Sequence, residues 1–355
     1  MRPFALIRPE SLTQARDLVV AKPEGRSFRA GGIDLMDRMK EGLDDPELLV
    51  ELRGVGELAG VTESAGFSPA TADGSVPENL PSGALWRVGA ATTLAEIAAN
   101  EALLDGAAAL VEAASQAATP GIRNTATVGG NLLQRPRCWY YRNRELVCLK
   151  KGGDMCLAIA GDNRYHAILG GGPSFIVHPS SLATALVALG ATVGTFRGAS
   201  AEDAITPGRV LPIEELFAGP KTDPTREHVL EDGEVLEAVL VPKAGAEMRS
   251  AYGAVREKQS HDWPLVEAAV RMRVDAGVMK DVRVALGHVA PVPWLSPEAA
   301  EVLEGQAPDA ELFARAAEAA VAKARPLDGN GYKVPMSKGL LREVLHRASG
   351  LALPE

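Results

Sequence analysis

The chain has 355 residues, a formal net charge of -9 and 46% apolar residues. This length and apolar content are enough for two or three domains that each bury a core without disulfide bonds. The net negative charge argues against nucleic acid or an anionic membrane surface as the partner, because binding phosphates requires a net basic field. The chain shows neither a signal-peptide core nor an apolar run of membrane-spanning length, so we expect a cytoplasmic protein, or a periplasmic one if a partner subunit carries it across in a folded complex.

The first 120 residues predict an opening α/β unit. Ser11 and Gln14 form a capping-box pattern ahead of a helix, and residues 27–40 predict a short strand, a glycine turn and a further element. Thr93 and Glu96 form a second capping box, which begins a helical region that we expect to run as a long Ala-rich helix to about residue 120. The remaining expectations are a strand within 48–61, an exposed loop at 63–84 and a strand at 85–89.

The second half of the chain predicts a change of architecture near residues 240–249. Two alternating apolar stretches joined at Asp275-Ala276-Gly277 predict a β-hairpin. Before the change we expect buried strands at 166–172 and 174–179, a capped helix at 180–190, and strands at 191–196 and 234–242, all still within an α/β layer; after the hairpin we expect helices at 297–305, 309–324 and 337–348. The predicted domains are residues 1–60, residues 61–242 with a cysteine-containing insertion at about 133–175, and residues 243–355.

Two glycine turns are candidate sites for a phosphate-bearing ligand. The first is Ala30 to Asp34 and the second is Thr127 to Asn131, and small residues in such turns let backbone N–H groups approach an anion closely. Each turn alone is more often structural, and neither has the G-x-G-x-x-G spacing of a Rossmann site. Two such turns in one chain favour a large ligand with two ends, such as a dinucleotide.

All three cysteines, Cys138, Cys148 and Cys156, lie within 19 positions in the pattern C-x9-C-x7-C. Their odd number and their clustering argue against a secreted disulfide framework, and the spacing fits neither common zinc sites nor the ferredoxin run. Clustered thiolates beside basic residues suit an iron-sulfur cluster or zinc, and three buried apolar cysteines are the alternative. The basic neighbours expected to offset the thiolate charge are Arg135, Arg137, Lys150 and Lys151, and the candidate fourth ligands are His166 and His178.

Hydrolytic chemistry has little support, because the sequence shows no Ser-His-Asp order, no H-E-x-x-H and no paired carboxylates of the catalytic kind. Redox chemistry through a bound cofactor fits better. Trp139, Tyr140 and Tyr141 either stack on a ring or pack in the core, and packing is the favoured interpretation.

Five segments in order along the chain carry a resemblance to a known family: AGGIDLMDRMK, GIRNTATVGGNL, SAYGAVREKQSHDWPLVEAAV, VALGHVAPVPW and LDGNGYKV. They resemble the FAD-binding medium subunit of the xanthine dehydrogenase and carbon monoxide dehydrogenase family of molybdenum hydroxylases. The resemblance covers nearly the whole chain, and I-R-N followed by T-V-G-G-N is its most specific part. It implies a mixed α/β and α+β fold, with a two-part FAD-binding domain followed by a C-terminal α+β domain that has an antiparallel sheet and helices.

The resemblance also implies which residues hold FAD. Both glycine turns would bind it, chiefly through its diphosphate and ribityl parts, and the isoalloxazine ring would lie between the second-turn domain and the C-terminal domain. The residues carried over by position are Phe28, Arg29, Ala30, Gly31, Gly32, Ile33, Asp34, Leu35, Thr127, Val128, Gly129, Gly130, Asn131, Ser181 and Lys258. Three positions depart from the family's usual pattern: Ser181 replaces an acidic residue, Ala254 a lysine, and Lys258 an arginine.

The cysteine segment resembles an insertion of one branch of the family, that of the iron-sulfur-containing aldehyde oxidoreductases. In that branch the insertion binds a 4Fe-4S cluster through four cysteines, whereas this chain offers Cys138, Cys148 and Cys156 and has Ser174 at the fourth position. The resemblance therefore implies a 4Fe-4S cluster, with a non-cysteine fourth ligand, a three-iron cluster or no cluster as the open alternatives.

The predicted function is that of an electron-transfer subunit in a molybdenum-dependent hydroxylase. It would carry no catalytic residue of its own and would pass electrons from iron-sulfur clusters through FAD to NAD, oxygen or another acceptor. The implied partners are a large subunit with the molybdenum cofactor and a small subunit with two 2Fe-2S clusters. Two alternatives remain, a stand-alone FAD oxidoreductase with a zinc-stabilised loop and a non-catalytic scaffold subunit that has lost its flavin.

Overall fold

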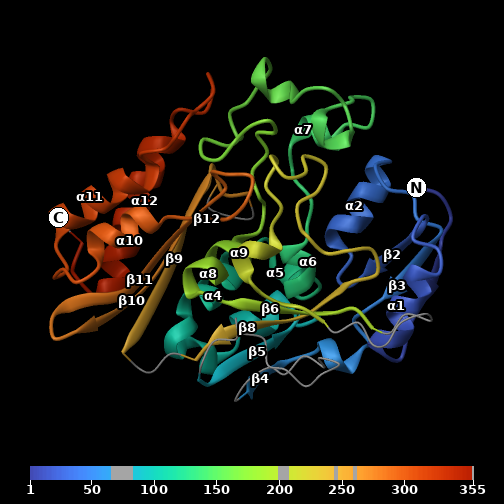
Figure 1. Cartoon of the computed structure of the whole chain (residues 1–355), viewed down its shortest axis with the longest axis horizontal. Helices are drawn as coiled ribbons and strands as arrows, with labels where there is room; N and C mark the ends of the chain where they lie inside the picture. Colours follow the sequence, from blue (N-terminus) through green and yellow to red (C-terminus); the bar gives the residue numbers. More distant parts are fainter. Residues whose placement is uncertain (65–82, 199–207, 244–246, 259–261, 354–355) are drawn as a thin grey trace.

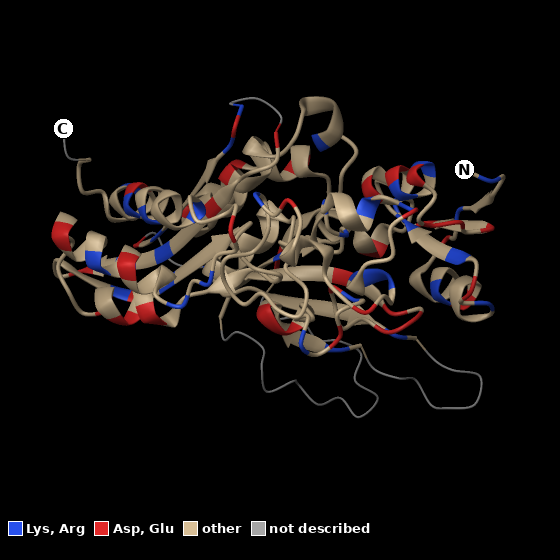
Figure 2. Ribbon diagram, turned by 90° about the horizontal axis from the view of Figure 1, so that it is seen from above, with Lys and Arg blue, Asp and Glu red and all other residues tan. Residues whose placement is uncertain are grey.

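Three β-sheets follow one another along the chain in the computed structural model, which describes residues 1–64, 83–198, 208–243, 247–258 and 262–353. The first sheet lies near the N-terminus, the second in the middle and the third beside the C-terminal helices (Figure 1). Lys and Arg alternate with Asp and Glu along the outer helices at both ends of the molecule (Figure 2). Among the residues described, no helix is both long and apolar enough to cross a membrane.

The first sheet is parallel and has the order β1-β3-β2. Its strands are β1 (Ala5–Ile7), β2 (Arg26–Arg29) and β3 (Leu48–Glu51), connected by α1 (Leu12–Val20) and α2 (Ile33–Glu41). Ser11 caps α1 by accepting a hydrogen bond from the amide of Gln14, as predicted. The Gln14 side chain accepts from the amide of Glu10, one residue earlier than a complete capping box requires.

The second sheet is antiparallel and has the order β4-β5-β8-β6-β7, so this part of the chain is α+β and not the expected α/β layer. The strand β8, which comes later in the sequence, lies between β5 and β6 and is hydrogen-bonded to both. The strands are β4 (Val61–Ser64), β5 (Leu85–Gly89), β6 (Thr192–Phe196), β7 (Val210–Pro212) and β8 (Val235–Pro242). Most of the loop predicted at 63–84 lies outside the described residues.

The helices over this sheet are shorter than the sequence suggested. Thr93 begins α3 with the predicted complete capping box, but the Ala-rich region is broken at Gly106, which has a φ of 87°. The helical elements in this part of the chain are η1 (Gly56–Leu58), α3 (Leu94–Ala98), η2 (Glu101–Leu103), α4 (Leu104–Gln116), α5 (Pro120–Arg123), α6 (Val128–Leu132), α8 (Ser181–Leu189) and α9 (Ile213–Leu216).

The third sheet is antiparallel, in the order β12-β11-β10-β9, and helices cover both of its faces. The predicted hairpin is confirmed: β10 (Val266–Asp275) and β11 (Val278–Gly287) are joined by Ala276 and Gly277, which have φ angles of 49° and 82°. The helices α4 and α8 pack on one face, and all nine residues of α8 are buried. The remaining elements are β9 (Met248–Val255), β12 (Trp294–Leu295), and on the other face α10 (Pro297–Leu303), α11 (Ala310–Val321) and α12 (Lys333–Ser349).

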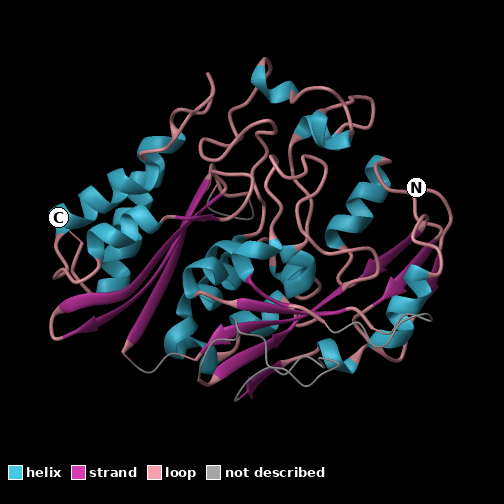
Figure 3. Cartoon of the chain, viewed as in Figure 1, coloured by secondary structure: helices cyan, strands magenta, loops and turns pink. Residues whose placement is uncertain are grey.

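The cysteine-containing segment is mostly loop (Figure 3), with α7 (Trp139–Arg142), η3 (Leu149–Lys151) and η4 (Leu157–Ile159) as short helical pieces. The strands predicted at 166–172 and 174–179 are wrong. Ile168 and Leu169 both donate to the carbonyl of Val289, an arrangement that does not alternate as a strand ladder does. Burial explains the apolar sequence of these segments without regular pairing.

Candidate functional site

The first glycine turn joins β2 to α2 and packs directly against the approach to the second turn. A Cβ atom on Gly31 would lie 2.2 Å from the carbonyl oxygen of Thr125, so only glycine fits there. Gly32 is the N-cap of α2, with a φ of 74° and no side-chain cap. The first N–H groups of α2 therefore have no partner within the helix, and the described residues supply none outside it, so these groups can bind a ligand.

The second glycine turn forms the start of α6. Thr127 is its N-cap and accepts a hydrogen bond of 3.2 Å from the amide of Gly130. Gly129 donates its amide to the carbonyl of Ala90 at 2.8 Å, and a Cβ on Gly129 would lie 3.1 Å from that carbonyl oxygen. Asn131 accepts a hydrogen bond of 2.6 Å from the hydroxyl of Ser180. These contacts fix the turn from both sides.

Both turns line one cavity of about 740 Å³. Every predicted residue from Phe28 to Leu35 lies on its wall, and Ser181 does as well. Val128 is buried beneath the wall, and Lys258 is exposed and does not line the cavity. The other predicted residues on the wall are Thr127, Gly129, Gly130 and Asn131.

The C-terminal domain contributes residues to the cavity wall that the sequence analysis did not identify. Arg256, Asp262 and Trp263 line it, and the guanidinium of Arg137 lies 4.7 Å from the centre of the Trp263 ring. Trp139 also lines the cavity, and its ring meets those of Tyr165 and His166 edge to face. The sequence carries no local signal for this role of Trp263, because its place on the cavity wall and its 46% exposure follow from the fold.

Asp34, on the cavity wall, is surrounded by arginines. Its carboxylate forms an ion pair with Arg137 at 2.7 Å, accepts a hydrogen bond from Arg142 at 2.5 Å, and lies 3.3 Å from Arg38. Burial alone would raise the pKa of Asp34, but these guanidinium groups and the amide of Arg135 outweigh it and hold the pKa below its usual value. Asp34 therefore orders the basic residues beside the first turn.

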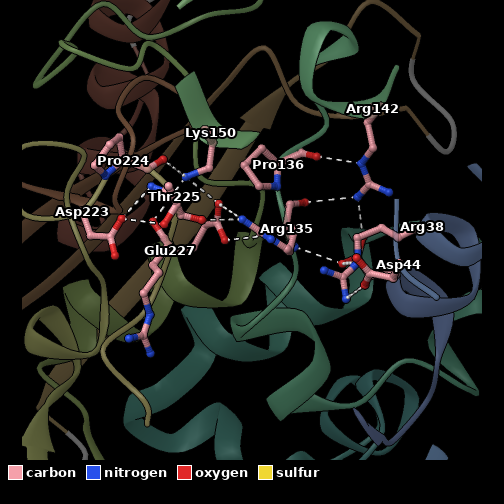
Figure 4. A network of polar contacts seen from close by, with 12 residues as sticks. Arg38, Asp44, Arg135, Pro136, Arg142, Lys150, Asp223, Pro224, Thr225 and Glu227 are labelled. Carbon is pink, nitrogen blue, oxygen red and sulfur yellow. Dashed lines mark hydrogen bonds and ion pairs between the residues drawn. The ribbon is translucent and has the colours of Figure 1, made fainter. Parts of the chain in front are cut away.

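Arg135 links the start of the cysteine-containing segment to two other parts of the chain (Figure 4). Its side chain donates to Glu227 at 2.8 Å, and its amide donates to Asp34 at 3.0 Å. Glu227 also forms an ion pair with Lys150 at 2.6 Å, and the side chains of Lys150 and Glu227 are only 3% and 5% exposed. Arg135 and Lys150 therefore form ion pairs with Glu227, and Arg137 forms one with Asp34; that these basic residues offset thiolate charge stays a prediction.

The three cysteines are free thiols. The sulfur of Cys138 lies 3.2 Å from Nε2 of His166, and burial raises the pKa of Cys138 to about 11, with smaller contributions from Cys156 and Cys148. His178, the other candidate ligand, packs edge to face on Phe217. Within the described ranges, no group of three or more His, Cys, Asp or Glu side chains is placed to hold a metal ion.

Comparison with known proteins decides the family. Residues 82–244 match the FAD binding domain in molybdopterin dehydrogenase, and residues 250–348 match the CO dehydrogenase flavoprotein C-terminal domain. The chain is 31% identical to the aldehyde oxidoreductase FAD-binding subunit PaoB of Escherichia coli strain K12, over 99% of this chain and 100% of that protein. The chain belongs to the FAD-binding medium subunits of the molybdenum hydroxylases.

Three further matches have lower sequence identity. The carbon monoxide dehydrogenase medium chain of Afipia carboxidovorans is 26% identical, over 98% of each chain. The structure of reconstituted CO dehydrogenase from Oligotropha carboxidovorans superimposes with a TM-score of 0.72 at 24% identity, covering 99% of this chain and 100% of that one. Quinoline 2-oxidoreductase from Pseudomonas putida 86 gives a TM-score of 0.70 at 22% identity, covering 98% of each chain. These two structures share the fold of this medium subunit.

The cavity fits the cofactor of the family. Its volume lies within the range of natural ligand sites. The free N–H groups at the start of α2 suit anionic oxygens, and the apolar part of the wall suits a planar ring system. That apolar part is formed by Leu52, Leu58, Leu94, Ala117 and Leu236.

Proposed function

We propose that this medium subunit holds FAD between its two glycine turns and is the electron outlet of a molybdenum hydroxylase. The single observation that supports this most strongly is the cavity, because two turns far apart in the sequence contribute to one wall. Bound FAD supplies a group that takes up and releases electrons, and the chain's own residues bind and orient it.

The backbone and the arginines have separate roles in this proposal. The start of α2, opened by Gly32 and Ile33, binds diphosphate oxygens through N–H groups. Thr127 keeps the second turn in shape by capping α6, and Arg137 bridges Asp34 of the first turn to Trp263 of the C-terminal domain. This bridge keeps the cavity closed between the domains.

The partners and the substrate follow from the relatives. We propose a large subunit with the molybdenum cofactor, a small subunit with two 2Fe-2S clusters, and an aldehyde as the class of substrate oxidised at the molybdenum. Electrons then pass through the iron-sulfur clusters and this chain to NAD, oxygen or another soluble acceptor. The similarity to an aldehyde oxidoreductase subunit over both full chains supports the substrate class.

We also propose that the segment 133–175 binds an iron-sulfur cluster. All three cysteines lie within 19 positions of the chain, and the sulfur of Cys138 lies 3.2 Å from Nε2 of His166. A cation or cluster would have to remove the thiol protons and draw the ligands together. Iron and acid-labile sulfide in equal amounts in the purified chain would support this proposal, and stoichiometric zinc would contradict it.

The test of the FAD proposal is the cofactor content of the assembled complex. Co-expression with the two neighbouring subunits, purification, denaturation and chromatography of the released flavin should give one FAD for each copy of this chain. A complex that contains molybdenum and iron but no flavin would contradict the proposal and support the scaffold alternative. A flavin-containing chain that purifies alone would support the stand-alone alternative.

A further inference from the structure

A buried carboxylate lies directly behind the cavity wall, where the C-terminal domain meets α8. Glu267, in β10, is 0% exposed. Its carboxylate accepts hydrogen bonds from the hydroxyls of Ser181 at 2.5 Å, Tyr252 at 2.6 Å and Thr184 at 2.8 Å. Three O–H donors directed at one carboxylate are the pattern expected of its ionised form, which only accepts.

In the described part of the chain, no Lys or Arg forms an ion pair with this carboxylate. Among the described residues, the only ion-pair contact of Glu267 is Nε2 of His288, at 3.7 Å. Burial lowers the pKa of His288 to about 4 although Glu267 acts to raise it, so the imidazole is neutral at neutral pH. Arg256 donates instead to the carbonyls of Asp262 and Gln116. An unneutralised buried charge costs stability unless several hydrogen bonds solvate it, as the three hydroxyls do here.

The sheet leaves space for this arrangement. Gly287 in β11 is the partner of Glu267 in the β10–β11 register. A Cβ on Gly287 would lie 2.2 Å from the Thr184 hydroxyl oxygen and 2.3 Å from a carboxylate oxygen of Glu267. The network therefore occupies a site that a side chain at position 287 would fill.

Ser181 connects the network to the cavity, because its residue lines the wall. Its only hydroxyl hydrogen is directed to Glu267, so toward the cavity its oxygen can only accept a hydrogen bond. We infer that Glu267 is a positioning residue for the flavin. Its carboxylate fixes Ser181 as a hydrogen-bond acceptor and places a negative charge beside the bound cofactor. This inference rests on the proposal that the cavity holds FAD.

The inference also accounts for the serine at position 181. The family resemblance places an acidic residue there, and this chain has a neutral hydroxyl. The carboxylate comes instead from position 267, across the interface between α8 and the third sheet.

The consequence is electrostatic. Electrons add negative charge to a bound flavin, and a nearby carboxylate in a weakly screened interior opposes that addition. Glu267→Gln keeps the shape of the side chain and removes the charge. At a fixed solution potential, the ratio of reduced to oxidised flavin should then rise on the order of tenfold.

The experiment is a spectroscopic redox titration of the flavin in the assembled complex. Thr184→Val is the matched control, since it removes a hydroxyl from the same carboxylate, keeps the charge and changes no residue of the cavity wall. The double variant Ser181→Asp/Glu267→Ser moves the carboxylate to position 181 and should bring the ratio of reduced to oxidised flavin back toward the wild-type value. Thr184→Val should lower the melting temperature and leave the ratio within about twofold of wild type.

Each outcome is decisive. An increased ratio in Glu267→Gln, or loss of FAD from Glu267→Gln while Thr184→Val retains it, supports the inference. An unchanged ratio in Glu267→Gln, equal loss of FAD from both single variants, or a double variant that behaves like Glu267→Gln overturns it. A wild-type complex without FAD would instead contradict the proposed function itself.

Discussion

Replacing Gly31 by alanine tests whether the close approach of the two glycine turns is needed for FAD binding. The new Cβ would lie 2.2 Å from the carbonyl oxygen of Thr125 and 3.1 Å from the Cα of Ala126. Favourable contacts begin near 3.5 Å, so the two backbones must separate by about 1 Å. Overpacking of this kind costs about 1–3 kcal/mol. When this free energy is lost on binding FAD, it lowers the affinity for FAD about 5- to 150-fold.

The assay is a fluorescence titration of the flavin-free complex with FAD, combined with a thermal melt. Gly121→Ala is the control, because Gly121 lies in the neighbouring α5 and its new Cβ would have only the Thr119 hydroxyl oxygen within 4 Å, at 3.9 Å. The control should bind FAD like the wild type. If Gly31→Ala does so too, with an unchanged melting temperature, the two turns do not form one rigid site and the reasoning is wrong.

Three further substitutions test the surroundings of the site. Glu227→Gln leaves Lys150 buried without its carboxylate and removes a partner of Arg135, so it should cost about 3–5 kcal/mol of unfolding free energy; a loss below about 1 kcal/mol in chemical denaturation would contradict this. Burial lowers the pKa of Lys333 to about 7 from its ordinary value of 10.5. Between these two pH values the unfolded chain binds a proton that the folded chain has released. The free energy of unfolding should therefore rise with pH in this window, by up to about 1.4 kcal/mol per pH unit. Lys333→Met should remove that rise, and an equal pH slope in both proteins would refute the assignment. Thr127→Val removes the cap of α6 at a cost of about 0.5–2 kcal/mol and should lower FAD retention on gel filtration, whereas Thr127→Ser should keep it; equal retention would show that the hydroxyl is not needed.

Local patterns predicted those features whose cause is local. The hairpin at Asp275 to Gly277 and the capped helix at Ser180 follow from turn chemistry and capping, and both are present. The two glycine turns were found as separate motifs, and the family resemblance brought them together as one FAD site. Their union in a single cavity depends on packing between Gly31 and Thr125, which no local pattern contains.

Features that depend on distant partners were missed or misread. The apolar runs at 166–172 and 174–179 are buried because they bond to Val289 and Ala290, and an apolar run alone does not say whether its partner is a regular strand. The basic residues beside the cysteines pair with carboxylates, as Lys150 does with Glu227. Glu267 is a single acidic residue within an apolar strand, and only the fold shows that three hydroxyls donate hydrogen bonds to it.

The most direct measurement of the central claim is hydrogen–deuterium exchange of the flavin-free complex with and without added FAD. The account predicts that FAD slows exchange in two segments at once, residues 28–35 of the first turn and residues 127–131 of the second, because both line the same cavity. Protection of only one of these segments, or of neither at saturating FAD, would contradict a single site built from both turns.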